Sequence, residues 1–343
     1  MAGQARARPH QGRAVKSACT VLISSAGRRV ELIRCFRAGA AHLGIDLRVL
    51  AVDVDPEMSA ACHMADLAVR VPRCDRAEFI EELHGICLRH GVDLIVPTID
   101  PELEPLSVHA ARFSEAGVDL AVAAPEVVRL ARDKLRTAHF LTTRGVPAPR
   151  SGRLDQVIAD PNAWSWPLMV KPRAGSSSVG IRILATAAQL AEFGEVPDKY
   201  LAQELLRGDE YTVNLFFDRT GRLVCAIPHL RCEVRAGEVA KGITRRHPEL
   251  EAIAWRLGEA LPGARAALCF QAIVDEAGRA AVFELNARFG GGYPLAHHAG
   301  ARFAQWLLED ATGRPSSAHN QWQDGVVMLR YDQAVFCAAP GGR

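Results

Sequence analysis

The chain has 343 residues, of which 49% are hydrophobic and 23% charged, and 41 Lys and Arg against 39 Asp and Glu leave a net charge of +2. A chain of this length is typical of about two or three domain-sized units and can bury enough surface to fold without disulfides or a structural metal. The near-balance of charge argues against a nucleic-acid partner, and the lack of a long apolar run argues against a membrane partner.

The first segment and the cysteines indicate the cellular compartment. Residues 1–18 are basic and lack the apolar core of a signal peptide, so we expect a disordered leader there. Nine cysteines are scattered along the chain, mostly in apolar surroundings and never as C-x-x-C. This usage is typical of free thiols in a reducing compartment, not of a zinc site, and predicts a cytoplasmic protein.

Short β-rich runs alternate with longer amphipathic stretches between Thr20 and Pro125. The predicted strands are 20–24, 47–55, 67–72, 93–99 and 119–123. The predicted helices are 30–44, 76–91 and 102–117, each ending at glycine. This alternation predicts an α/β fold with a doubly wound parallel sheet. Ligands of such sheets bind at the carboxyl ends of the strands, which is where Asp53, Asp55, Asp100 and Glu102 fall.

The turn after the first strand, SSAGRRVEL, does not carry a dinucleotide fingerprint. It has one glycine, Gly27, where G-x-G-x-x-G needs three. A nicotinamide dinucleotide site is therefore not expected. Arg28 and Arg29 at this turn either meet an anion or belong to an ordinary solvated turn, and the pattern leaves both open.

The pattern changes near residue 150, from α/β to an α+β arrangement of mainly antiparallel strands. A helical stretch at 127–145 leads into VPAPRSG, whose prolines and glycine mark a link between domains. Beyond it come a strand ending at Lys171, a Gly/Ser-rich loop and antiparallel strands around a DRTGR hairpin. The last part predicts helices at 248–261 and 294–311, with the strands LCFQAIVD and AAVFELNA between them.

The loop at 175–180, GSSSVG, is rich in backbone N–H and hydroxyl donors that suit phosphate oxygens. It is not a Walker A motif, because Ile181 follows where Lys-Ser/Thr is required. Lys171 precedes the loop in an apolar strand. Its ammonium either points at a phosphate or extends to the surface.

The segment FELNAR, residues 283–288, predicts a polar strand face. Glu284 and Asn286 project to the same side, because side chains in a strand alternate with period two. Two oxygen ligands suit Mg²⁺, which takes few protein ligands together with substrate phosphates. Gln271 on the neighbouring strand can reach that face, and Arg288 would complement an anion there. The alternative is a plain solvated strand face.

These motifs follow one another in an order that resembles the ATP-grasp enzymes, most closely the carbamoyl-phosphate-synthase-like group of carboxylate–amine ligases. The matching residues are Lys134, Lys171, the GSSSVG loop, Gln203, Glu204, Glu210, Gln271, Glu284, Asn286 and Arg288. SAGRRVEL, IDPELEPL, FGGGYPL and MLRYD also look like that group. The resemblance implies a pre-ATP-grasp domain at 19–127, a small lobe at 128–200, a large lobe at 201–335 and a tail at 336–343.

The resemblance also implies a role for each matching residue. Lys134 and Lys171 would contact ATP phosphates, and a loop would close over them, formed by Gly175, Ser176, Ser177, Ser178, Val179 and Gly180. The adenine and ribose would be held by Gln203, Glu204, Leu205, Leu206 and Glu210. One or two Mg²⁺ ions, which Mn²⁺ can replace, would bind Gln271, Glu284 and Asn286. The catalytic groups would be Arg288, at the transferring phosphoryl group, and Lys241, on a loop against the phosphates.

The substrate side is left with alternatives. A pocket beyond the metal strand would be formed by Gly290, Gly291, Gly292, Tyr293 and His297; alternatively, the glycines only turn the chain and the histidine begins a surface helix. Asp100 and Glu102 would face this pocket and suit a cationic amine. Arg330, on the resemblance, would hold a substrate carboxylate.

The activity that the resemblance implies is ligation of a small carboxylic acid, with an amino acid expected, to an amine. ATP would convert the acid to an acyl phosphate, which has a good leaving group, and release ADP and phosphate. A carboxylate or carbamate kinase and a non-catalytic ATP-binding regulatory protein are the alternatives. The small-molecule acid and amine are the expected partners, and homodimers are common among such relatives.

Overall fold

The computed structural model describes residues 14–175, 180–192 and 197–338, so most of the predicted leader lies outside the described residues. The N-terminal region forms a parallel sheet in the order β3-β2-β1-β4-β5, which confirms the predicted doubly wound topology. Its strands are β1 (Ala18–Ser24), β2 (Asp46–Asp53), β3 (Leu67–Arg70), β4 (Leu94–Pro97) and β5 (Asp119–Leu120). Because the chain turns from one side of β1 to the other, the carboxyl ends of β1 and β4 form the crevice where such sheets bind ligands.

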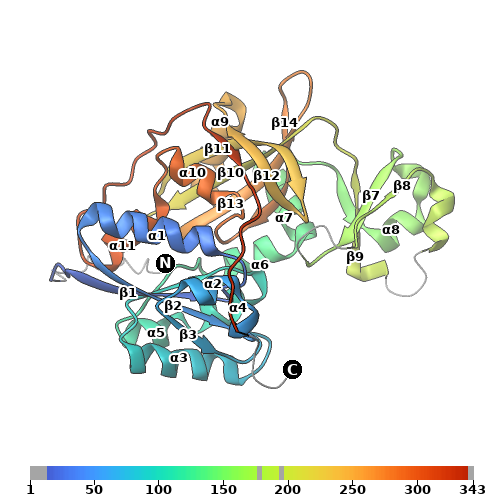
Figure 1. Ribbon diagram of the computed structural model, residues 1–343. Coiled ribbons are helices and arrows are strands. Elements are labelled where there is room, and N and C mark those ends of the chain that lie inside the picture. Colours follow the sequence, from blue (N-terminus) through green and yellow to red (C-terminus); the bar gives the residue numbers. More distant parts are fainter. Residues whose placement is uncertain (1–13, 176–179, 193–196, 339–343) are drawn as a thin grey trace, which may run out of the picture.

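Helices flank this sheet (Figure 1). They are α1 (Val30–Leu43), α2 (Ala60–Met64), α3 (Glu78–His90), α4 (Asp100–Val108) and α5 (Ala110–Glu115). α1 and α3 each end at a glycine in the left-handed conformation, Gly44 and Gly91, as the sequence predicts. α4 begins directly after β4, which brings Asp100 to the crevice.

The predicted helical stretch at 127–145 is divided into α6 (Pro125–Arg132) and α7 (Lys134–Thr143). Asp133 between them is extended, and its carboxylate accepts hydrogen bonds from the backbone N–H groups of Leu135 and Arg136. An aspartate that caps a new helix ends the previous one. Similarly, the helix predicted at 294–311 is two, α10 (Tyr293–His298) and α11 (Phe303–Ala311), separated at Gly300 with φ +105°.

A small antiparallel sheet follows and stands to one side of the molecule in Figure 1. It has the order β6-β9-β7-β8, with β6 (Ser151–Arg153), β7 (Leu168–Pro172), β8 (Arg182–Leu184) and β9 (Tyr200–Glu204). It packs on α8 (Leu154–Ala159) around its own buried cluster, which includes Leu154, Val157 and Leu168. Short 3₁₀ helices are formed by Pro56–Met58, Pro161–Ala163, Ala187–Glu192 and Pro197–Lys199.

The large sheet is antiparallel, in the order β14-β13-β10-β11-β12-β15. Its strands are β10 (Asp209–Phe217), β11 (Leu223–Arg235), β12 (Glu238–Thr244), β13 (Ala266–Val274), β14 (Ala280–Asn286) and β15 (Val327–Leu329), and α9 (Pro248–Ala260) packs on it. The predicted DRTGR hairpin joins β10 to β11.

The N-terminal region and the large sheet share their hydrophobic cores. Each of the two large buried clusters contains residues from both, and α1 packs directly on α10 and α11. Phe36 of α1 and Phe289, just after β14, meet edge to face with ring centroids 6.4 Å apart. This packing holds the crevice of the N-terminal sheet against the end of β14.

Two sequence expectations about the whole chain can be compared with this structure. The nine cysteines are free thiols and six of them are buried, as predicted. Among the described residues, no helix combines the length and the apolar character that a membrane span requires.

Candidate nucleotide and substrate site

A cavity of about 520 Å³ lies where the three sheets meet. The lobe end is lined by Lys134, Lys171, Gln203, Glu204, Leu206, Glu210, Gln271, Glu284 and Asn286. The interdomain end is lined by Arg28, Arg29, Asp100, Glu238, Arg288, Gly290, Gly291 and Gly292.

Two lysines converge at the lobe end. Lys171, on β7, is only 3% exposed, and its Nζ donates to Oε1 of Gln203 at 2.9 Å. Lys134, at the start of α7, donates to the carbonyl of Gly175 at 2.6 Å and lies 3.7 Å from Oε1 of Glu284. Burial lowers the pKa of Lys171 to about 8, helped by the charge of Lys134 and opposed by Glu284. The result is a cationic wall beside a carboxylate, suited to phosphate oxygens.

Gln271 and Glu284 are opposite each other on β13 and β14, as predicted. In the amide orientation that satisfies both of its neighbours, Gln271 donates to Oε2 of Glu284 at 3.1 Å and accepts from Arg231. Arg231, on β11, also lies 3.2 Å from Glu210. Burial raises the pKa of Glu210, although Arg231 opposes this. The sequence predictions did not include Arg231, because nothing in β11 marks its side chain as facing this cavity.

The donor set at the lobe end fits Mg²⁺ when phosphate oxygens are also present. Glu284 and Asn286 provide a carboxylate and an amide oxygen on one strand face, and Asn286 Oδ1 is 3.5 Å from Arg288. Within the described part of the chain, no group of three or more His, Cys, Asp or Glu could hold a metal. One carboxylate with two amides is therefore a weak site by itself, and Mg²⁺ commonly completes such a set with phosphate and water.

Only some of the remaining residues that were predicted to bind the nucleotide line the cavity. Gly175, Glu204 and Leu206 line the cavity, whereas Leu205 and Gly180 are not among its lining residues. The loop residues Ser176, Ser177, Ser178 and Val179 lie outside the described residues. Lys241, on β12, also does not line the cavity; its half-exposed side chain pairs with Glu233 at 2.6 Å.

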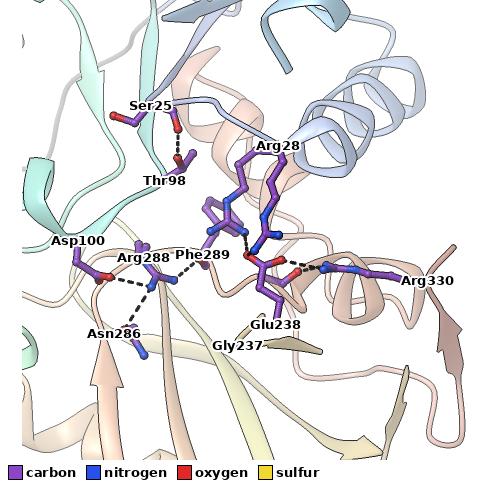
Figure 2. A network of polar contacts seen from close by, with 12 residues as sticks. Ser25, Arg28, Thr98, Asp100, Gly237, Glu238, Asn286, Arg288, Phe289 and Arg330 are labelled. Carbon is purple, nitrogen blue, oxygen red and sulfur yellow. Dashed lines mark hydrogen bonds and ion pairs between the residues drawn. The ribbon is translucent and has the colours of Figure 1, made fainter. Parts of the chain in front are cut away.

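Arg288 and Asp100 join the two domains at the interdomain end (Figure 2). Arg288 Nη2 donates to Asp100 Oδ2 at 2.8 Å, and Nη1 donates to the carbonyl of Phe289 at 3.0 Å. Asp100 does line the cavity, but its carboxylate is already paired with a cation. An amine at this position would compete with Arg288 for the Asp100 carboxylate, and the expected role of Asp100 towards a cationic amine stays a prediction.

Glu102 is placed differently from the sequence expectation. It is fully buried behind the crevice and does not line the cavity. Its carboxylate accepts hydrogen bonds from the hydroxyls of Ser24 and Ser25, at 2.5 and 2.8 Å, and from the backbone N–H groups of Thr98 and Ile99, at 2.7 and 3.1 Å. Burial raises its pKa despite these bonds. Glu102 ties the carboxyl ends of β1 and β4 together instead of meeting a substrate.

Glu238, at the start of β12, is the centre of an ion-pair cluster that the sequence predictions did not include. Its carboxylate lies 3.0 Å from Arg29, 3.4 Å from Arg28 and 2.8 Å from Arg330 (Figure 2). Burial would raise the pKa of Glu238, but the arginines, Arg29 foremost, lower it overall. Arg28 and Arg29, in the turn after β1, thus meet an anion instead of forming a solvated turn, and that anion is the carboxylate of Glu238.

The turn formed by Gly290, Gly291 and Gly292 lines the cavity, and a larger residue would not fit at two of its positions. A Cβ at Gly291 would lie 2.7 Å from the carboxylate carbon of Glu238, and one at Gly292 would lie 2.7 Å from Nε2 of His229. Arg330 donates to the carbonyl of Gly291, which fixes this turn against β15.

Tyr293 and His297 lie beneath the turn and do not line the cavity. The Tyr293 hydroxyl accepts from the backbone N–H of Ala304 at 2.9 Å and lies 3.2 Å from Nδ1 of His297. Burial lowers the pKa of His297 to about 4, so its ring is neutral at pH 7. Tyr293 and His297 were expected in the substrate pocket, but they lie in the core beneath it.

Comparisons with known proteins match this architecture. Residues 21–121 match the family described as PylC-like, N-terminal domain, and residues 131–292 match the ATP-grasp domain. A D-alanine–D-alanine ligase of Marinobacter nauticus is 34% identical over 119 residues, covering 32% of this chain and 36% of that protein. A carbamoyl-phosphate synthase of Methanobrevibacter smithii is 27% identical over 140 residues, covering 38% and 36%. These two matches span about a third of the relatives' length.

Two solved structures have the same fold. The biotin carboxylase domain of the 2-oxoglutarate carboxylase of Hydrogenobacter thermophilus, in complex with MgADP, ADP and bicarbonate, has a TM-score of 0.71 at 21% identity and covers 88% of this chain and 71% of that one. An ADP complex of N5-carboxyaminoimidazole ribonucleotide synthetase has a TM-score of 0.71 at 16% identity and covers 92% and 82%. The chain therefore contains an ATP-grasp domain, preceded by a PylC-like N-terminal domain.

Proposed function

We propose that the protein is an ADP-forming carboxylate–amine ligase that binds MgATP at the lobe end and its carboxylic acid at the interdomain end. One observation carries the proposal: a single cavity contains the cationic wall of Lys134 and Lys171, the oxygen face of Glu284 and Asn286, and Arg288 leading towards the interdomain end. Phosphate binding, metal binding and an anion-binding group thus follow one another along one cavity.

The lobe end would hold the nucleotide by charge and shape. Lys134 and Lys171 would face the phosphates, and Glu210 the ribose hydroxyls. Glu204 and Leu206 would border the adenine, as the family resemblance implies. Glu284 and Asn286 would hold Mg²⁺, with Gln271 joining them once its bond with Arg231 is released. When bound, Mg²⁺ would neutralise charge on the β- and γ-phosphates.

Arg288 is the chain's own group for the reacting phosphoryl. Its guanidinium is held by Asp100 and by the Phe289 carbonyl, so it needs little reorganisation before reaction. A carboxylate does not react with an amine at neutral pH, because its leaving group would be oxide. Transfer of the γ-phosphoryl group to the carboxylate would give an acyl phosphate, and Arg288 would stabilise the negative charge on the transferring oxygens.

The test is release of ADP and phosphate from MgATP across pools of small acids and amines. We expect release only when a particular acid and amine are both present, and release at least about a hundredfold slower from the Glu284→Gln variant. Release of ADP without phosphate in the presence of the acid alone, with the acyl phosphate accumulating in solution, would instead establish a carboxylate kinase. A protein that does not bind MgATP would refute the proposal.

A further inference from the structure

The interdomain end carries more positive than negative charge among the described residues. Arg28, Arg29 and Arg288 line it, and Arg330 lies behind it on Glu238, against the two carboxylates Asp100 and Glu238. Both carboxylates are already paired, Asp100 with Arg288 and Glu238 with the other three arginines. An ammonium group entering this end would therefore have to displace an arginine, whereas an anion would not.

The arginines around Glu238 retain unused hydrogen-bonding capacity. A guanidinium has five N–H donors, and one carboxylate cannot satisfy three such groups. Arg28 makes only a 3.4 Å contact with Glu238 and its side chain is 63% exposed. Burial lowers the pKa of Arg29, and the neighbouring Arg288, Arg28 and Arg330 lower it further against the opposing effect of Glu238. The cluster is thus short of negative charge.

The three guanidinium groups are held in place from different parts of the chain. Arg28 and Arg29 are on the turn after β1, Glu238 begins β12, and Arg330 follows β15 and donates to the carbonyl of Gly291. Figure 2 shows Arg28 and Arg330 reaching the Glu238 carboxylate from different sides, with Arg288 and Asp100 nearby. Glu238 is a positioning residue here, because its carboxylate holds the guanidinium groups beside the cavity.

We propose that Arg28 and Arg29, supported by Arg330 through Glu238, bind a second carboxylate of the acid substrate, whose reacting carboxylate lies at Arg288. The substrate class is then a dicarboxylic acid. This inference rests on the proposed function for the reacting carboxylate, but the second subsite stands on the arginine cluster alone. A carboxylate suits it, because these arginines already accommodate one in Glu238 and because guanidinium groups pair with carboxylates through two parallel hydrogen bonds.

Isothermal titration calorimetry without nucleotide tests the subsite directly. Succinate, glutarate and adipate are each compared with their own monoamide, which keeps the length and removes one charge. We expect at least one diacid to bind at least about tenfold more tightly than its monoamide. Equal affinities for every pair, or no binding of any diacid, would overturn the inference.

Variants assign the effect to the cluster. Arg28→Gln, at an exposed side chain, is expected to fold normally and to reduce the preference for the diacid to about threefold or less. Arg37→Gln, on the exposed face of α1 where Arg37 pairs with Asp66, is the matched control and should keep the preference. A preference that survives Arg28→Gln and Arg29→Gln unchanged would place the second carboxylate elsewhere. A separate MgATP titration distinguishes failure of the proposed function from failure of the second subsite. If the protein does not bind MgATP, the proposed function fails, but binding of the diacid is still expected.

Discussion

The two ends of the cavity are built in different ways. At the lobe end, the groups suited to phosphate and metal lie at strand spacing or beside a loop, as with Glu284 and Asn286 on one face of β14. At the interdomain end, each charged group acquires its role from a distant partner: Arg288 pairs with Asp100 and Arg29 with Glu238 across the domain boundary. The comparison indicates that the proposed nucleotide site follows from local sequence patterns, whereas the proposed substrate site depends on how the N-terminal region packs against the large sheet.

The largest effect is expected from the lobe end. Glu284→Gln removes the one carboxylate of the proposed metal face, and kcat for MgATP turnover should fall at least about a hundredfold, because several kcal/mol of charge stabilisation are lost. Glu276→Gln, in the exposed turn of the same β13–β14 hairpin, is the control. Steady-state ADP release and circular dichroism measure the two variants. Wild-type turnover in Glu284→Gln would remove this face from the metal site.

A steric change tests the interdomain end. Gly292→Ala should lower the free energy of unfolding by about 1–3 kcal/mol, because its Cβ would collide with the fully buried His229 ring and with Val239. Gly85→Ala in α3, where a Cβ meets only the far end of Arg89, should instead stabilise by up to about 1 kcal/mol. Urea denaturation measures both. Equal stability of Gly292→Ala and wild type would mean that the turn can relax.

The pH dependence of MgATP binding tests the charge of Lys171 at the lobe end. With burial lowering the pKa of Lys171 to about 8, its ammonium is charged at pH 7 and mostly neutral at pH 9. Phosphates favour the charged form, so the Kd should rise with pH above 8, approaching about tenfold per pH unit. Lys171→Arg stays charged and should bind MgATP with little change over this range. An identical slope in wild type and Lys171→Arg would exclude Lys171 as the titrating group.

The smallest effect is expected at Lys241, which the family resemblance places against the phosphates and the structure pairs with Glu233 on β11. Lys241→Ala should change kcat/KM by less than about fivefold, since its side chain does not line the cavity and an exposed ion pair contributes at most about 1 kcal/mol. Lys171→Ala, measured alongside, should weaken MgATP binding far more. A loss greater than about tenfold in Lys241→Ala would return Lys241 to the lobe end as the sequence expects.

The fold could be predicted where periodicity was strong. The alternation before residue 125 indicated a parallel sheet, and the DRTGR turn indicated a hairpin. The breaks at Asp133 and Gly300 were missed, because apolar spacing continues across both and only the local backbone conformation ends the helix. Glu102 was misplaced for a related reason: position at a strand end does not say whether a carboxylate faces the crevice or the hydroxyls behind it.

By itself, the sequence determined that a parallel sheet precedes the antiparallel strands. It also determined that Glu284 and Asn286 share one face of β14, because side-chain alternation is a property of the strand. Only the tertiary structure decided the state of the charges. An ion pair such as Arg29 with Glu238 exists only when residues far apart in the chain meet, and burial, which lowers the pKa of Lys171, exists only once the lobes have packed. Both effects depend on distance and desolvation, which no run of neighbouring residues encodes.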